Sequence, residues 1–322
     1  MESTSRNCPF ASIIIPTYNV ERCLERAVRS ALDQTFQDFE VIIIDDASVD
    51  GTVSLARKLA AEDKRIRVLP LASNGGPSTA RNAGLDAAEG QWIVILDADD
   101  AFKPDRLAQL FAFCSRHQCD VIADDLVLFD QGIQSELGPC FQWHMPHLLD
   151  IDLLLQRDVY LRGQPLGWIK PVFRRSFLLE NNVRYPPHYR HAEDFYVLAS
   201  LLLSGAKFWL VPYTGYIYTL RTGAVSQEKS PYSASVPSMD NIADSCDEIL
   251  ARFDWKLSPA QRAALRARKE RFRAGHHLDV ARQHLKSGHP DHALKVLAYH
   301  PRAAILAAEQ IFRRTCLRIK GK

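Results

Sequence analysis

The first 120 residues alternate four times between a short apolar run and a segment with helical periodicity. The apolar runs are residues 11–15, 39–44, 66–70 and 92–96, and the helical segments are residues 20–32, 53–61, 77–89 and 105–118. The second run is dominated by apolar residues, as expected for a strand covered on both faces. This alternation predicts an α/β fold with a mostly parallel, doubly wound sheet and right-handed crossovers.

Polar residues follow each of the four predicted strands at the point where it ends. They are Thr17-Tyr18-Asn19, Asp45-Asp46, Asn74-Gly75-Gly76 and Asp97-Ala98-Asp99-Asp100. Ligands of doubly wound sheets bind beyond the carboxyl ends of the strands, so we expect these loops to face one crevice. Four polar loops that face one crevice indicate a ligand site more specifically than any one of the loops does.

The fourth loop has the composition of a cation site. Carboxylate oxygens suit Mg²⁺ and Mn²⁺, and Mg²⁺ sites typically combine one or two carboxylates with substrate phosphates. The i, i+2 spacing puts Asp97 and Asp99 on the same side of an extended chain, where they can address one metal–diphosphate together. The same residues also suit a capped turn before a helix opened by Pro104, and on this segment alone the two interpretations are evenly matched.

Length and composition are those of a soluble globular protein with one large or two modest domains: 322 residues, 47% hydrophobic and 24% charged. The net charge of +2 hides an asymmetry, because residues 256–322 carry +12 and the first 255 residues about −10. A basic tail indicates a polyanionic partner, such as an anionic membrane leaflet or nucleic acid. A solvated, arginine-rich helical surface explains the charge nearly as well.

One apolar stretch, residues 195–213, has the ~20-residue length of a membrane span. Ser204-Gly205 and Pro212 interrupt it, so a buried helix near 194–203 followed by a strand at 207–211 fits better. Seven cysteines without a CxxC pair, and no evident secretory signal, indicate a reducing cytosolic compartment. Beyond residue 238 the pattern is helical, over residues 240–252, 258–286 (with a break allowed at Gly275), 290–298 and 301–318.

The polar loops resemble those of family 2 glycosyltransferases, the inverting nucleotide-sugar enzymes of GT-A fold. The matching blocks are Pro16-Thr17-Tyr18-Asn19, Asp45-Asp46-Ala-Ser-Val-Asp50-Gly51-Thr52, Gly76-Pro-Ser-Thr-Ala-Arg81-Asn82-Ala-Gly84 and Asp97-Ala-Asp99-Asp100. The resemblance covers roughly residues 10–230. It implies a nucleotide-sugar-binding half at 10–125, an acceptor-binding half at 126–235 and a basic helical C-terminal region at 236–322, in a protein of the bacterial exopolysaccharide or cell-surface glycan type.

The resemblance assigns nucleotide binding to the first two loops. Pro16, Thr17 and Tyr18 lie where the family binds the nucleotide, and the ring of Tyr18 is expected to stack on the base; packing is the alternative role for this ring. Asp46 matches the carboxylate that accepts the uracil N3–H, with Asp45 beside it. Cytosine has no such proton, so UDP-sugars are the expected donors.

The next two loops are expected to hold the rest of the donor. Arg81 matches a family position near the base and diphosphate, although a surface ion pair would also explain it. Asp97 resembles the ribose-side carboxylate and Asp99 the ligand of Mg²⁺ or Mn²⁺. Many family members carry a histidine near the loop 221–226 as a further ligand, and this loop has none.

The reaction also needs a base. His191-Ala192-Glu193-Asp194 resembles the family's acidic pair at the head of a helix, with alanine at 192 in place of the usual glycine. Asp194 matches the base that takes the proton from the attacking hydroxyl, and Glu193 is its neighbour. An acidic pair that serves only the helix macrodipole is the alternative.

Weaker matches extend the site. Trp168 and Lys170 resemble residues near the donor or acceptor sugar. Arg221 and Ser226 resemble a loop that closes over the diphosphate, for which a guanidinium is well suited. The eleven histidines do not form a metal site by their spacing.

Together these matches predict a cytoplasmic, metal-dependent inverting transferase that moves glucose or galactose from UDP to a hydroxyl of a growing, lipid-linked surface polysaccharide. The basic tail is then expected to dock on the inner face of the plasma membrane, with a homodimer interface as another use; nucleic acid is not an expected partner. A metal-dependent phosphohydrolase is one rival, although no nucleophilic aspartate follows the first strand. A non-catalytic nucleotide-sugar-binding scaffold is another, and the complete acidic set argues against it.

Overall fold

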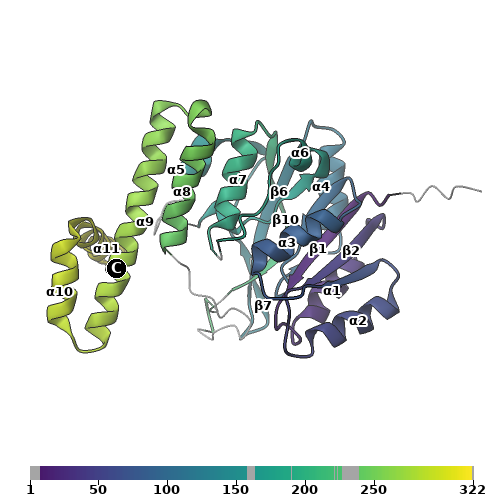
Figure 1. The fold of residues 1–322 in the computed structure, drawn as a ribbon, viewed down its shortest axis with the longest axis horizontal. Coiled ribbons are helices and arrows are strands. Elements are labelled where there is room, and N and C mark those ends of the chain that lie inside the picture. Colours follow the sequence, from purple (N-terminus) through teal and green to yellow (C-terminus); the bar gives the residue numbers. More distant parts are fainter. Residues whose placement is uncertain are drawn as a thin grey trace, which may run out of the picture. The chain divides into compact units, whose positions relative to one another are not determined.

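The computed structural model describes residues 8–157, 164–189, 191–220, 222, 224–226 and 239–320, with residues 312–320 described by their backbone. Its first part has the expected alternation of strands and helices (Figure 1). The elements are β1 (Ala11–Thr17), α1 (Leu24–Leu32), β2 (Phe39–Asp45), α2 (Thr52–Glu62), β3 (Ile66–Pro70), α3 (Pro77–Ala87), β4 (Trp92–Ile95), β5 (Ala101–Phe102) and α4 (Arg106–Cys114). The strand interpretation is therefore confirmed, and β1 includes Pro16 rather than stopping before it.

The strands form one mixed sheet in the order β3-β2-β1-β4-β9-β6-β10-β5. Strands β1 to β4 pair in parallel, as the sequence pattern predicts. Strand β9 (Val172–Arg174) then inserts antiparallel between β4 and β6 (Val121–Asp130), and β6 pairs in parallel with β10 (Phe208–Thr219). The ends of β1, β2 and β4 consequently meet at one edge, and β10 reaches that edge from the second half of the chain.

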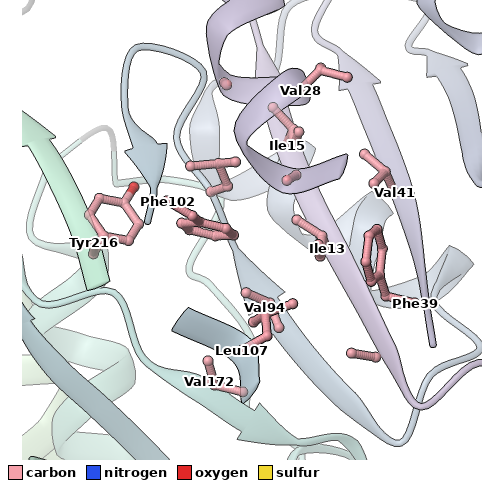
Figure 2. Close-up of a cluster of buried hydrophobic side chains, with 14 of the residues drawn as sticks. Ile13, Ile15, Val28, Phe39, Val41, Val94, Phe102, Leu107, Val172 and Tyr216 are labelled. Carbon is pink, nitrogen blue, oxygen red and sulfur yellow. The ribbon is translucent and has the colours of Figure 1, made fainter. Parts of the chain in front are cut away.

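Side chains of the sheet alternate between two helical layers. Ile13 and Ile15 face a core with residues from α1, α2 and α4 (Figure 2). Ile14 faces α3. A β-carbon on Gly84 of α3 would lie 2.4 Å from Ile14 Cγ2, so only glycine allows this close packing. Each fully buried aliphatic side chain contributes about 1.5–3 kcal/mol, which makes this sheet a rigid support for the loops at its edge.

The middle of the chain contains short elements. They are β7 (Ser135–Pro139), β8 (His147–Leu149), α5 (Ile151–Arg157), the 3₁₀ turn η1 (Leu166–Trp168), β9 and α6 (Arg175–Glu180). The apolar stretch after it forms α7 (Glu193–Leu203) and β10, as predicted. None of the helices in the described part of the chain has both the length and the apolar character needed to cross a bilayer.

The chain divides into two compact units, Met1–Ile151 with Leu166–Ser235, and Asp152–Pro165 with Val236–Lys322. The second unit contains the helices α5, α8 (Met239–Phe253), α9 (Pro259–Lys286), α10 (Pro290–Tyr299) and α11 (Pro301–Lys320). Helix α9 begins at a capping box between Ser258 and Gln261 and continues through Gly275 without a break. The division into donor and acceptor halves stays a prediction.

Candidate active site

A polar pocket lies where β4, β10 and the start of α7 meet. Its volume is about 160 Å³, and its lining consists of Arg81, Asp97, Asp99, Asp100, Gly167, Trp168, Lys170, Glu193, Asp194, Tyr218 and Thr219. Seven of these residues were singled out from the sequence, from segments up to 113 residues apart: Arg81, Asp97, Asp99, Trp168, Lys170, Glu193 and Asp194. The fold therefore joins the aspartate loop after β4 to the acidic pair that opens α7.

Two buried cations connect the acidic groups in this pocket. Arg81 donates to Asp97 Oδ1 at 2.9 Å and to Glu193 Oε1 at 3.0 Å. Lys170 Nζ lies 2.9 Å from Asp97 Oδ2 and 3.5 Å from Asp194 Oδ2. Asp97 thus bridges the two cations, and each cation reaches an acid of α7. The surface ion pair considered for Arg81 is excluded, because its side chain is 6% exposed.

The ion pairs shift the proton affinities of these groups. Burial alone would lower the pKa of Lys170, but Asp194 and Asp97 hold it well above its ordinary value. Burial alone would raise the pKa of Asp97, whereas Lys170 and then Arg81 hold it well below its ordinary range. Burial, and after it the neighbouring Asp194, raises the pKa of Glu193. Lys170 is therefore a cation and Asp97 an anion throughout the neutral range.

A scan of family models matches residues 12–147 to "Glycosyl transferase family 2". The succinoglycan biosynthesis protein ExoU of Rhizobium meliloti is 30% identical over 283 residues, which cover 84% of this chain and 79% of ExoU. The chain belongs to glycosyl transferase family 2. The resemblance seen in the sequence is thereby confirmed.

Other family members share less of their length with this chain. ExoO, another succinoglycan biosynthesis protein of Rhizobium meliloti, is 34% identical over 226 residues, which span 68% of this chain and 63% of ExoO. Residues 1–349 of S. aureus TarS, solved in complex with UDP, superimpose with a TM-score of 0.61 at 22% identity, covering 80% of this chain and 69% of that fragment. The UDP-GlcNAc complex of TarS gives a TM-score of 0.63. These superpositions confirm the GT-A fold.

Asp99 is the pocket carboxylate that fits a metal ion. Its side chain forms no hydrogen bond or ion pair with any other residue that the structure describes, whereas Asp97, Asp100, Glu193 and Asp194 all have partners. Burial, and after it Asp97, raises the pKa of Asp99. A partly buried carboxylate without such a partner is costly unless a cation binds there. Among the described residues no group of three or more His, Cys, Asp or Glu side chains could hold a metal, so diphosphate oxygens would have to complete the coordination.

The backbone of the aspartate loop is held by residues that the sequence analysis did not single out. Arg26 of α1 and the Thr219 hydroxyl both donate to the carbonyl oxygen of Asp99, at 2.9 and 2.6 Å. The Asp100 carboxylate accepts from Tyr216 Oη and the Thr219 backbone N–H, both at 2.8 Å. Asp100 was part of the family motif, but nothing in the sequence around Arg26 or Thr219 indicates a role beside a loop in another segment.

The start of α7 has an unusual backbone. Ala192, the residue before Glu193, has a φ of 77°, in the left-handed region that favours glycine. This conformation explains why the family usually has glycine at this position. It also turns the chain so that Glu193 and Asp194 begin the helix and face the pocket.

The five residues of the first two blocks that are expected to bind the nucleotide lie at the ends of β1 and β2 or directly after them, and they are not part of the pocket lining. Tyr18 is 48% exposed, so its ring is accessible, and Pro16 lies within β1. Thr17 donates to Ile44 O at 3.1 Å, and Asp45 accepts from the Ser48 backbone N–H at 3.0 Å. The first contact joins β1 to β2, and the second holds the loop that follows β2.

Asp46 has a structural role besides its expected one. Its Oδ1 and Oδ2 accept the backbone N–H groups of Gly75 and Gly76, at 2.8 and 2.7 Å. This contact holds the loop that leads into α3, where Gly76 has a φ of 84°. Each carboxylate oxygen has a second lone pair, so the contact leaves Asp46 able to accept a further N–H.

The loop expected over the diphosphate is described in part. Arg221 and Gly223 lie outside the described residues. Ser226 donates its hydroxyl to Asp130 Oδ1 at 2.6 Å, and Asp130 Oδ2 accepts the backbone N–H groups of Val225 and Ser226. These bonds, with the Ser226 hydroxyl first, lower the pKa of Asp130 to about 2. The carboxylate at the end of β6 therefore holds this loop, and a contact of Ser226 with the donor stays a prediction.

Proposed function

We propose that this protein is an inverting hexosyltransferase that uses a UDP-sugar and a divalent cation to extend a bacterial surface polysaccharide. The observation that supports it best is the single pocket shared by Asp99 and Asp194. One group is suited to a metal–diphosphate, and the other heads a helix from the second half of the chain. A transferase needs both, because donor and acceptor must meet at one carbon atom.

The donor is assigned to the loops at the edge of the sheet. Tyr18 would stack on the base, Asp46 with Asp45 would accept the uracil N3–H, and Pro16 and Thr17 would line the nucleotide. Asp97 would face the ribose. Nε of Arg81 is buried without a hydrogen-bond partner among the described residues, which leaves it a donor for an oxygen of the nucleotide. The family members crystallised with UDP and UDP-GlcNAc support a uridine nucleotide.

Asp99 would hold Mg²⁺ or Mn²⁺ together with oxygens of the diphosphate. A bound cation there would neutralise charge on the leaving diphosphate. Lys170 and Arg81 add two fixed positive charges to the same pocket, and Arg221 would add a third. Trp168, stacked on Tyr218 with ring centroids 5.3 Å apart, offers an apolar surface beside these charges for a sugar ring.

Asp194 would act as the base. As the acceptor hydroxyl oxygen bonds to the anomeric carbon, the bond from that carbon to the diphosphate oxygen breaks and UDP leaves with its electron pair. The hydroxyl proton moves to the Asp194 carboxylate. Attack from the face opposite the leaving group inverts the configuration. Glu193, paired with Arg81, would keep Asp194 in place, and its raised pKa makes it an additional proton acceptor.

The relatives support the choice of acceptor. ExoO and ExoU are succinoglycan biosynthesis proteins, which supports a growing exopolysaccharide as the acceptor. A lipid-linked chain, a cytoplasmic location on the inner face of the plasma membrane and a homodimer belong to the proposal as well. The +12 charge of residues 256–322 supports the membrane location.

Calorimetric titration with UDP, GDP and TDP, each with and without Mn²⁺, tests the donor site. We expect binding of UDP alone, and only with the metal. Asp99→Asn should abolish it, and Asp194→Asn should preserve it. No nucleotide binding under any of these conditions would refute the proposal. Phosphate release from a phosphoester without an acceptor would favour a phosphohydrolase, and UDP binding without sugar transfer to any acceptor would favour a scaffold.

A further inference from the structure

The second unit contains a groove that the proposed reaction does not use. It has a volume of about 420 Å³ and lies between α9 and α11. Its lining is Arg266, Ala267, Glu270, Arg271 and Ala274 of α9, with Arg302, Ile305, Leu306 and Glu309 of α11. The volume is within the range of sites that bind small molecules in proteins, about 300–1,000 Å³.

The groove has an apolar floor and a charged rim. Ala274 and Leu306 are buried against the core of this unit, and Ile305 presents a 60% exposed aliphatic side chain beside them. Arg266 lies at the rim and forms no ion pair or hydrogen bond with any described residue. This arrangement matches an amphiphile whose anionic head binds guanidinium groups while its hydrocarbon part covers Ile305 and Leu306.

Of the other two arginines, the exposed Arg302 could turn to an anionic head at little cost. Arg302 is paired with Glu270, and Arg271 lies 2.8 Å from Glu309. The side chains of Arg302 and Glu270 are 64% and 43% exposed. Solvent-exposed pairs contribute only about 0–1 kcal/mol, so a phosphate can replace a glutamate partner without a large loss.

The positive charge of the C-terminal segment favours the same ligand, an anionic amphiphile. Residues 256–322 have 16 Lys and Arg against four acids, and α9 and α11 belong to this segment. An anionic bilayer attracts such a segment with about 1 kcal/mol for each basic residue near its surface. We propose that the α9–α11 groove binds an anionic phospholipid of the membrane surface. This inference rests on the proposed membrane location and specifies its contact site.

Vesicle flotation tests the groove. The full-length protein is mixed with vesicles of phosphatidylcholine alone or with an equal share of phosphatidylglycerol, at 100 and 500 mM NaCl. We expect the protein to float only with the anionic vesicles. Arg266→Glu should lower the partition coefficient roughly 30-fold through the loss of one positive and the gain of one negative charge, and Ile305→Asp roughly tenfold or more through lost apolar burial.

Two variants of the first unit are matched controls. Arg57→Glu reverses an exposed charge on α2, and Ile133→Asp replaces an apolar side chain that is 45% exposed. Both should float like the wild type. Thermal melts and Mn²⁺–UDP binding of every variant show whether the protein is folded and whether the donor site is intact, independently of vesicle binding.

The possible outcomes distinguish the groove as a lipid site from the membrane location of the protein. If both groove variants float like the wild type, the α9–α11 groove is not the lipid site. The membrane location would then rest on other basic residues. If the wild type does not float with anionic vesicles, both the groove site and the membrane location are wrong. A wild-type dimer in light scattering that Ile305→Asp converts to monomer, without any vesicle binding, would mean that a second copy covers the groove and would also overturn the inference.

Discussion

The guanidinium of Arg26 reaches across the edge of the sheet to the carbonyl oxygen of Asp99, 73 residues further along the chain, at a distance of 2.9 Å. The same Nη2 donates to the Thr219 hydroxyl at 2.7 Å, which itself donates to Asp99. Three elements that are distant in sequence are thereby joined at one peptide unit. These contacts hold the backbone of Asp99, and among the described residues its carboxylate has no hydrogen-bond or ion-pair partner.

Arg26→Met should therefore weaken metal-dependent binding without touching the ligand. Residues that orient a metal ligand typically contribute 10–100-fold to metal affinity, so we expect a rise of about that size in the Mn²⁺ concentration needed for UDP binding. Arg26→Lys should restore part of the affinity. Arg29→Met, which removes an exposed arginine of the same helix, is the control. An unchanged Mn²⁺ requirement in Arg26→Met would disprove the positioning role.

Asp99→Asn should raise the thermal stability of the metal-free protein and remove its UDP binding. Asp99 is partly buried and its carboxylate has no partner among the described residues, so removing its negative charge relieves repulsion from Asp97. The protein without metal should therefore melt higher than the wild type. Each kcal/mol corresponds to about 2–4 °C for a domain of 150–250 residues. Melts with excess chelator check the gain, and calorimetry checks the loss of UDP binding. A lower melting temperature would mean that Asp99 has a stabilising partner in solution.

Asp194→Asn should keep donor binding and lose sugar transfer. General-base catalysis typically contributes about 10²–10⁴-fold, and kcat should fall by that factor. The affinity for UDP with Mn²⁺ should change little, because Asp97 and Asp99 remain. Transfer of labelled sugar to an acceptor, measured beside calorimetry, tests both statements. Unimpaired transfer would exclude Asp194 as the base.

Ala192→Gly should stabilise the protein. The left-handed conformation costs an alanine about 1–2 kcal/mol, whereas the added chain entropy of glycine costs about 0.5–1 kcal/mol. We expect a net gain of about 0.5–1 kcal/mol in urea unfolding. Gly205→Ala is the reverse control, since Gly205 has a φ of 89° and open space around it, and it should lose stability. Equal stability of all three proteins would argue against backbone strain at residue 192.

Asp130 should make stability depend on pH below about pH 4. Its pKa is lowered from 3.8 to about 2 by the Ser226 hydroxyl and then by backbone N–H groups. A carboxyl whose pKa is lower in the folded state stabilises the protein above its unfolded pKa, and this contribution disappears as the pH falls from 3.8 toward 2. Urea unfolding of the wild type and Asp130→Asn should therefore differ most above pH 4 and converge below it. A difference that is constant from pH 3 to 7 would contradict this assignment.

The alternating strands and helices of the first 120 residues, and the gathering of acidic side chains at one edge of the sheet, could be predicted from the sequence. Apolar runs such as residues 41–44 bury both faces of a strand, and aspartates at the end of such a run can only project from the edge of the sheet. The family blocks added Asp194 and Glu193, which lie in a segment with no periodic signal of its own. These patterns can be recognised in the sequence because each one is formed by residues that are neighbours along the chain.

The tertiary structure alone decided which groups are paired and which one is left for a ligand. Strand β9 has three residues, too few for a periodic pattern, yet its place between β4 and β6 brings Lys170 to Asp97 and Asp194. The contact from Arg26 to Asp99, and the lack of a partner for the Asp99 carboxylate among the described residues, likewise depend on chain segments that meet only after folding. Ion pairs and hydrogen bonds act over a few ångströms in space, and the order of residues along the chain does not specify such distances.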